Sequence, residues 1–196
     1  IAPLFSYLKE EDYVSMQQNL AWLDVRAAAG APLQEALSLP TWPARSSFQN
    51  ELLVPGMPLA AMPVESLYKA WSTQQGNAFG ATRGLYLGDP ARHLSQVYRE
   101  LAIEVPAEFA SMPDHLTLEL ELLALLLDAG NGEAARQLAA DHLDWLDEYD
   151  AALADRADIV AHNEALPSVR RRNLLDGIAF LRALAALAQR TVGEAL

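Results

Sequence analysis

The sequence contains no cysteine. Without thiols the chain cannot form a disulfide scaffold, hold an iron–sulfur cluster, bind zinc through thiolates or use a cysteine nucleophile. The same absence is more typical of proteins from a reducing compartment. A chain of 196 residues needs no such crosslink, because a protein of this size buries roughly 70% of its unfolded surface.

Basic residues are also scarce. The chain carries 14 Lys and Arg against 26 Asp and Glu, which gives a formal net charge of −12. This balance repels a phosphate backbone, so we do not expect a nucleic-acid partner. The longest aliphatic run, residues 122–127, is far shorter than the ~18–20 apolar residues of a membrane span. Nothing at Ile1 resembles a signal peptide, and we expect a protein that is not embedded in a membrane.

The common catalytic motifs are missing as well. The sequence has no G-x-S-x-G, no P-loop and no H-E-x-x-H. Gly76, Gly80 and Gly84 form a G-x-x-x-G-x-x-x-G pattern, but polar residues interrupt it and it is most simply a loop. A nucleotide-dependent enzyme that uses His115 as a base is disfavoured, because no glycine-rich phosphate cradle is present.

Alanine and leucine dominate what is present, in a chain that is 52% hydrophobic and 20% charged. Both are strong helix formers, and no long stretch alternates apolar and polar residues as a strand would. The sequence therefore predicts an all-α fold, a compact bundle of about eight or nine helices. The length favours a single domain over residues 1–196.

Helical spacing and terminal signals place the main helices. Asp89 and Pro90 are typical of an N-cap and a first helical residue. The three prolines and the glycine of residues 55–63 indicate an ordered loop. The glycine-rich segment 76–88 is the best candidate for a hinge between two helical halves. The predicted helices cover residues 12–29, 44–53, 64–73, 89–101, the stretch from 112–114 to before Gly130, 132–145 and 172–192.

Histidine provides the strongest chemical signal. His115 follows Asp114 at a predicted helix start, and Glu119 lies one turn further on the same helix face. These three residues could form a pocket that binds a cation or shuttles a proton. The simpler interpretation, which spacing alone favours, is that Asp114 caps the helix and His115 pairs with Glu119 as part of the structure.

Two further charged groups are better explained as solvated surface. His142 lies among acidic residues and could be part of a metal site, but no second histidine stands at ligand spacing. The run of residues 170–172, Arg-Arg-Arg, could hold an anion, although a solvated basic turn is the simpler interpretation. Spacing alone thus favours a binding protein over an enzyme.

Ordered sequence motifs resemble one known family. The most specific is residues 112–123, MPDHLTLELELL, which is similar to the family pattern E-P-x-D-H-x-x-x-E-L-x-F-M/L. The family is that of the TorD/DmsD-type redox-enzyme maturation chaperones, with the nitrate-reductase NarJ chaperones as relatives. The resemblance spans about residues 50–190. The other matching pieces are ELLVP (51–55), MPVESLY (62–68), LGD (87–89), VYREL (97–101), HLDWL (142–146) and FLRAL (180–184).

The resemblance implies a cytoplasmic, all-α chaperone that is not an enzyme. Such proteins bind the twin-arginine signal peptide and the apo catalytic subunit of a molybdoenzyme, and delay export until the client has received its molybdopterin guanine dinucleotide. They carry no cofactor of their own, although some family members bind guanine nucleotides weakly. Monomers and domain-swapped dimers both occur in the family.

The resemblance also implies a peptide-binding pocket formed by Tyr68, Gly88, Pro113, Asp114, His115 and Glu119. Asp114 would accept a hydrogen bond from a client arginine, His115 would orient Asp114 or contact the peptide, and Glu119 would hold His115. Tyr68 would pack on the apolar part of the signal, and Gly88 would allow close backbone approach. Met112 replaces the glutamate of the family pattern, so one acidic position is lost.

A second function remains open. The chain could be a helical interaction protein that binds the mature part of a client enzyme without recognising its leader. The acidic charge favours leader recognition, because a twin-arginine signal combines a cationic head with an apolar helix and needs an apolar groove with an acidic rim.

Overall fold

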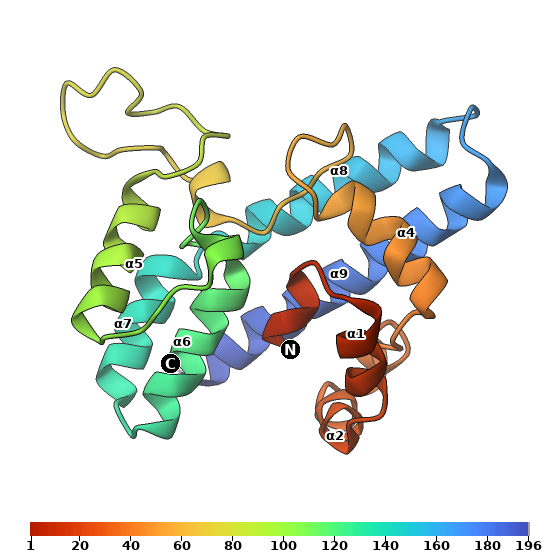
Figure 1. Ribbon diagram of the computed structural model, residues 1–196, viewed down its shortest axis with the longest axis horizontal. Coiled ribbons are helices and arrows are strands. Elements are labelled where there is room, and N and C mark those ends of the chain that lie inside the picture. The colour runs from red at the N-terminus through yellow and green to blue at the C-terminus, as the bar shows by residue number, and fades with distance from the viewer. Residues whose placement is uncertain (196) are drawn as a thin grey trace. The chain divides into compact units, whose positions relative to one another are not determined.

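The computed structural model describes residues 1–195 and is all-helical, which confirms the predicted fold class (Figure 1). Over these residues the only β-type pairing is an isolated antiparallel bridge between Val64 and His115. No helix in the described range is long and apolar enough to cross a membrane. The helices are η1 (Ala2–Phe5), α1 (Glu10–Gln17), α2 (Leu20–Ala28), α3 (Ala31–Gln34), α4 (Trp42–Leu52), η2 (Glu65–Leu67), α5 (Asp89–Glu100), η3 (Ala107–Phe109), α6 (Leu116–Asp128), α7 (Gly132–His142), α8 (Leu146–His162) and α9 (Ser168–Ala195).

The backbone divides into two compact units. The first unit consists mainly of residues 3–62 and 149–194, and the second mainly of residues 63–148. The segment 76–88, the predicted hinge, lies inside the second unit and away from both boundaries. Hinge motion at this segment stays a prediction.

In the first unit, α4 packs against α9. Phe48 of α4 is fully buried, and its ring lies where Gly177 of α9 has no side chain. Arg182 of α9 forms a two-pronged ion pair with Asp150 of α8, at 2.7 and 2.8 Å. The turn that joins α8 to α9 lies at the right of Figure 1. Glycine at position 177 therefore allows two helices to approach closely.

Replacing Gly177 with alanine should destabilise the protein by about 1–3 kcal/mol, although alanine is the better helix former. The new Cβ would lie 2.3 Å from Cγ of Phe48, so the ring or the helix must move. Gly193→Ala is the matched control on the same helix, because no described atom lies within 4 Å of its added Cβ. Urea unfolding should show a loss for the first variant and no loss for the second. Equal stability of the two variants would contradict the packing.

The second unit is built on α5, α6 and α7. Helices α6 and α7 lie side by side, and η2 contacts α5 (Figure 1). Gly130, at φ +71°, makes the turn between α6 and α7, and Asn131 caps α7 by accepting from the Ala134 N–H at 3.2 Å. The fully or nearly fully buried side chains of this unit include Leu94, Tyr98, Leu116, Leu123 and Trp145.

Two predicted helices differ from the observed ones. The helix expected over 12–29 is broken into α1 and α2, because Asn19 adopts an extended conformation and caps α2 through the Ala21 N–H at 2.9 Å. The helix expected over 64–73 is only the short η2. Its remaining backbone N–H groups bind elsewhere: Trp71 donates to the Thr82 carbonyl at 2.8 Å and Ser72 donates to the Gly80 carbonyl at 3.1 Å.

The later predicted helices are present, but their first or last residues differ from those predicted. Gly88 rather than Asp89 occupies the N-cap position of α5, and α7 ends at His142 before the predicted residue 145. Helix α8 was not predicted as a separate element. Helix α9 begins before the predicted residue 172, so the basic run lies in its first turns rather than in a connecting turn, while Arg170 and Arg172 are exposed as predicted. Arg170 pairs there with Glu51 at 2.6 and 2.8 Å.

Candidate functional site

The predicted site residues are brought together by a crossing of two chain segments in the second unit. The Glu65 N–H donates to the Asp114 carbonyl at 3.0 Å, and the Leu116 N–H donates to the Pro63 carbonyl at 2.9 Å. These bonds flank the bridge between Val64 and His115. The loop that ends in η2 is thereby fixed against the N-terminus of α6.

Asp114 is fully buried at this crossing. One oxygen, Oδ2, accepts from the Ser66 N–H at 2.7 Å and from the Ser66 hydroxyl. The hydroxyl oxygen in turn accepts from the Gly88 N–H at 3.1 Å. Burial raises the pKa of Asp114, while the bonds from Ser66 oppose this rise. The carboxyl group therefore holds η2 and the start of α5 in place.

Gly88 is required by close packing of the backbone. A Cβ at this position would lie 2.9 Å from the Trp71 carbonyl oxygen and 3.2 Å from Oγ of Ser66. The next residue, Asp89, donates its N–H to the same Trp71 carbonyl at 2.7 Å. The close approach predicted for Gly88 thus occurs between parts of this chain.

His115, and not Asp114, caps α6. Its Nδ1 accepts from the Thr117 N–H at 3.2 Å, and its ring packs against Phe109 with the centroids 4.9 Å apart. The side chain is 2% exposed, and burial lowers the pKa of His115 to about 3. A neutral imidazole is what the cap requires, because a protonated Nδ1 cannot accept a hydrogen bond.

The remaining predicted residues differ in exposure. Tyr68 is half-buried and stacks on Trp145, with centroids 5.2 Å apart and planes 12° from parallel. Pro113 is buried beside Asp114. Glu119 is fully buried and lies with Glu65 and His142 rather than forming the cap with His115.

The interpretation of His142 as solvated surface is wrong, because His142 is buried and faces Glu65 in a polar cluster that sequence reasoning missed. Nδ1 of His142 lies 2.7 Å from Oε2 of Glu65, and its Nε2 lies 2.7 Å from Nδ1 of His93. Lys69 approaches Oε1 of Glu65 at 2.7 Å and also pairs with Asp144. The i,i+4 spacing of Glu65 and Lys69 was the available signal. The approach of residue 142 to residue 65 carries no local signature.

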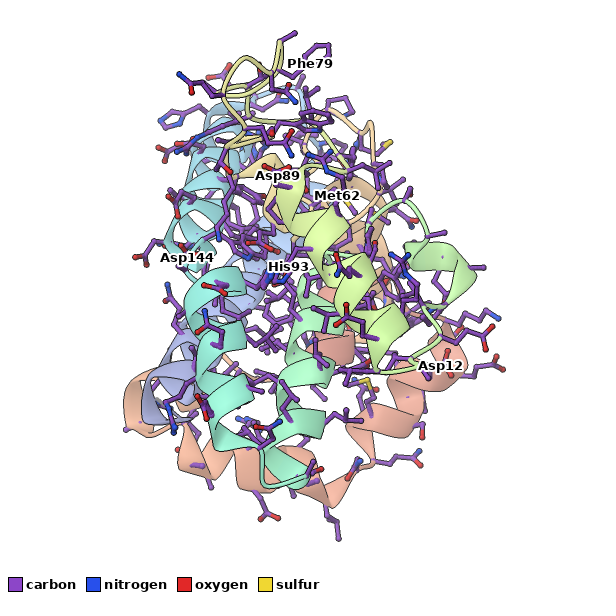
Figure 2. All side chains as sticks on the ribbon, turned by 90° about the vertical axis from the view of Figure 1, so that its left-hand side faces the viewer. Asp12, Met62, Phe79, Asp89, His93 and Asp144 are labelled. Atoms are coloured by element: carbon purple, nitrogen blue, oxygen red, sulfur yellow. The ribbon has the colours of Figure 1, made fainter. Side chains whose placement is uncertain are left out.

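Two adjoining cavities lie next to this cluster. The polar cavity, of about 400 Å³, is lined mainly by Glu65, Lys69, Asp89, His93, Asp141 and His142. The apolar cavity, of about 300 Å³, is lined mainly by Val97, Leu101, Leu122, Leu126 and Leu138. His93, Asp141 and His142 belong to both walls. Figure 2 faces this side of the second unit and labels Asp89, His93 and Asp144 on it.

A comparison with known families identifies the chain. Residues 24–158 match the nitrate reductase delta subunit family, over more than half of the sequence. The chain belongs to this family. The nitrate reductase delta subunit family comprises maturation chaperones of molybdoenzymes and is related to the TorD/DmsD-type chaperones, so the predicted family relationship is confirmed. No curated protein and no solved structure matches the chain significantly.

The match extends the family relationship toward the N-terminus. The motif resemblance begins at about residue 50, whereas the family match begins at residue 24, within α2. The whole of the second unit falls inside the matched range. Both cavities are therefore built from residues that the delta subunit family covers.

Proposed function

We propose that this delta-subunit chaperone binds the twin-arginine signal peptide of its molybdoenzyme client at the two adjoining cavities. The apolar cavity takes one face of the peptide's apolar helix, and the polar cavity takes the paired arginines. The observation that carries the proposal is that these two surfaces share a wall. A peptide with a cationic head and an apolar helix can then occupy both at once.

Charge complementarity supports the placement of the arginines. Asp89 and Asp141 line the polar cavity, and Glu100 lines the apolar one. The lining residues that carry a fixed positive charge are represented by Lys69. Lys69 is already neutralised by Glu65 and Asp144. A guanidinium bound to the exposed Asp141 gains a charge-assisted hydrogen bond worth roughly 1.5–3 kcal/mol, whereas Asp89 is already paired with Arg92 and would have to exchange that partner. The net charge of −12 steers the cationic head toward the chaperone.

The six residues carried over from the family serve in this proposal mainly as positioning residues. Asp114 and Gly88 hold Ser66, which directly follows the cavity residue Glu65 within η2. His115 fixes the start of α6, whose Leu122 and Leu126 line the apolar cavity. Their loss would loosen the cavity walls. Because Asp114 is fully buried, the arginines of the client would meet acids of the cavity wall such as the exposed Asp141 rather than Asp114.

Calorimetric titration with synthetic leaders of the molybdoenzymes encoded near its own gene tests the proposal. We expect micromolar or tighter binding of one leader, and a loss of at least tenfold when its paired arginines become lysines, because lysine cannot form the two-pronged contact. Binding of the leaderless client with equal affinity would instead support the alternative, in which the chaperone recognises the mature enzyme. Absence of binding to every leader would overturn the proposal.

Leu126→Glu should weaken leader binding by at least tenfold, because it places a charge in the apolar cavity. Leu127→Glu is the matched control, since Leu127 is the next residue of α6, is 40% exposed and does not line that cavity. Titration of both variants against the same leader gives the comparison. If the two variants bind the leader with equal affinity, the peptide binds at another surface.

A further inference from the structure

A buried carboxylate of α6 has no partner that accounts for it. Glu119 is fully buried, and neither of its carboxylate oxygens accepts a hydrogen bond of good geometry, although the side chains of Glu65 and Trp145 lie beside it. The Trp145 indole lies close enough to lower the pKa of Glu119, but its N–H donates to the His142 carbonyl at 2.8 Å. A buried carboxylate without a donor or counterion is costly, so Glu119 is either held protonated or balanced by a bound cation.

The surroundings of Glu119 make the charge imbalance larger. Glu65 and Asp114 are both fully buried and both lie near Glu119. Lys69 supplies one positive charge, and its ammonium lies against the carboxylates of Glu65 and Asp144 rather than against Glu119. The described residues therefore leave an excess of acidic groups around a buried point.

The donor atoms at this point are of the types that bind metal ions in proteins. One oxygen of Glu65, one oxygen of Glu119 and one ring nitrogen of His142 lie within 4.8 Å of one another. Zn²⁺ bonds of about 2.0–2.2 Å place such donors roughly 3.3–3.6 Å apart. Metal entry therefore requires the 2.7 Å contact between Nδ1 of His142 and Oε2 of Glu65 to open. Glu65 and His142 also line the polar cavity, which leaves room for water as a further ligand.

His93 supplies the outer contact that a ligating histidine needs. When Nδ1 of His142 binds a metal, the ring proton resides on Nε2 and must be accepted. Nδ1 of His93 lies 2.7 Å from that Nε2, and the two rings are stacked with centroids 4.9 Å apart. Partners of this kind fix the orientation of a metal-binding imidazole.

We propose that Glu65, Glu119 and His142 bind a divalent transition-metal ion of the Zn²⁺ class, with His93 as the positioning partner of His142. One nitrogen and two carboxylate oxygens suit Zn²⁺ better than Mg²⁺ or Ca²⁺, which prefer all-oxygen sites. The ion neutralises Glu119 and joins η2, α6 and α7, which together carry the walls of the two cavities. The site does not depend on whether a signal peptide binds.

Titration of the untagged, chelator-treated chain with ZnCl₂ tests this site. We expect one Zn²⁺ per chain with micromolar or tighter affinity, and a rise in Tm of roughly 5–10 °C at a hundredfold excess over Kd. His142→Gln and Glu119→Gln should weaken binding by at least 100-fold. His93→Gln should weaken it by about 10–100-fold, as outer-shell substitutions do. His162→Gln, at an exposed position near the end of α8, is the control and should bind as the parent does.

The Glu119→Gln variant keeps the test decisive. Glutamine has the same shape without the buried charge, so the metal-free variant should remain helical and melt at or above the metal-free parent. Substitution with Co²⁺ adds a visible absorption band whose loss in Glu119→Gln reports on the ligand directly. A folded parent that binds no Zn²⁺ even at concentrations 100-fold above the expected Kd would overturn the proposal. So would a Glu119→Gln variant that binds Zn²⁺ like the parent. Either result would favour a carboxyl pair that shares one proton.

Discussion

Arg45→Met is expected to destabilise the first unit by about 3–5 kcal/mol. Arg45 is fully buried on α4, and its guanidinium donates to the Leu4 carbonyl at 2.9 Å and to the Ser6 carbonyl. Its Nε donates to Gln49 at 3.0 Å, and Gln49 donates in turn to the Leu8 carbonyl at 3.0 Å. Methionine fills similar space but leaves the two carbonyls without their donor.

The surroundings of Arg45 explain why the loss should be large. Burial lowers the pKa of Arg45 to about 10, and the charge is compensated mainly by carbonyl groups and by the rings of Tyr13 and Phe48, 5.7 and 5.1 Å away. Arg45→Lys retains the charge without the planar fork, so it should be intermediate. Arg172→Met, at an exposed position of α9, should change stability by less than about 0.5 kcal/mol. Urea unfolding that ranks Arg45→Met with Arg172→Met would contradict the structural role.

Local sequence signals predicted most of the helices but not the contacts of Arg45. The tendency of a segment to form a helix depends mainly on its own residues and their spacing. For this reason α5, α6 and α9 were located correctly. The break at Asn19 was missed because Asn is tolerated inside a helix as well as favoured at a cap. Arg45 resembles any solvated arginine at a helix start, since its acceptors are about 40 residues away.

The candidate site was predictable only in part for the same reason. Asp114, His115 and Glu119 are neighbours in sequence, so their proximity follows from the helix alone. Their roles depend on Ser66, Glu65 and His142, which are brought in by the bridge at Val64 and by α7. The helix spacing placed Glu119 beside His115, whereas the long-range contacts place it beside Glu65 and His142.

His115→Asn should remove much of the acid sensitivity of the protein. The pKa of His115 is lowered to about 3 by burial, whereas an unfolded histidine titrates near 6.5. Between these values the unfolded state binds a proton that the native state does not, so stability falls as the pH falls. From pH 6.5 to 4.5 this amounts to about 2 kcal/mol, because the unfolded histidine is half protonated at pH 6.5 and the slope of 1.36 kcal/mol per pH unit is reached only below it.

Two buried carboxyl groups act in the opposite direction. Burial raises the pKa of Asp114 and of Glu119, so the native state binds protons more readily than the unfolded state and gains stability as the pH falls. The difference between parent and variant isolates the contribution of His115, because both proteins retain these carboxyls. Asparagine can still accept from the Thr117 N–H, so the cap of α6 is preserved.

Urea unfolding of the parent and of His115→Asn at pH 7 and at pH 4.5 measures this difference. At pH 7 the variant should lose about 1 kcal/mol, because the packing of the ring on Phe109 is lost. On acidification the parent should lose about 2–3 kcal/mol more than the variant. His162→Asn, at an exposed site, should retain the parental pH dependence. If the free energy of unfolding of His115→Asn depends on pH as that of the parent does, His115 takes up its proton in the native state. That result would contradict the cap, in which a neutral Nδ1 accepts from the Thr117 N–H.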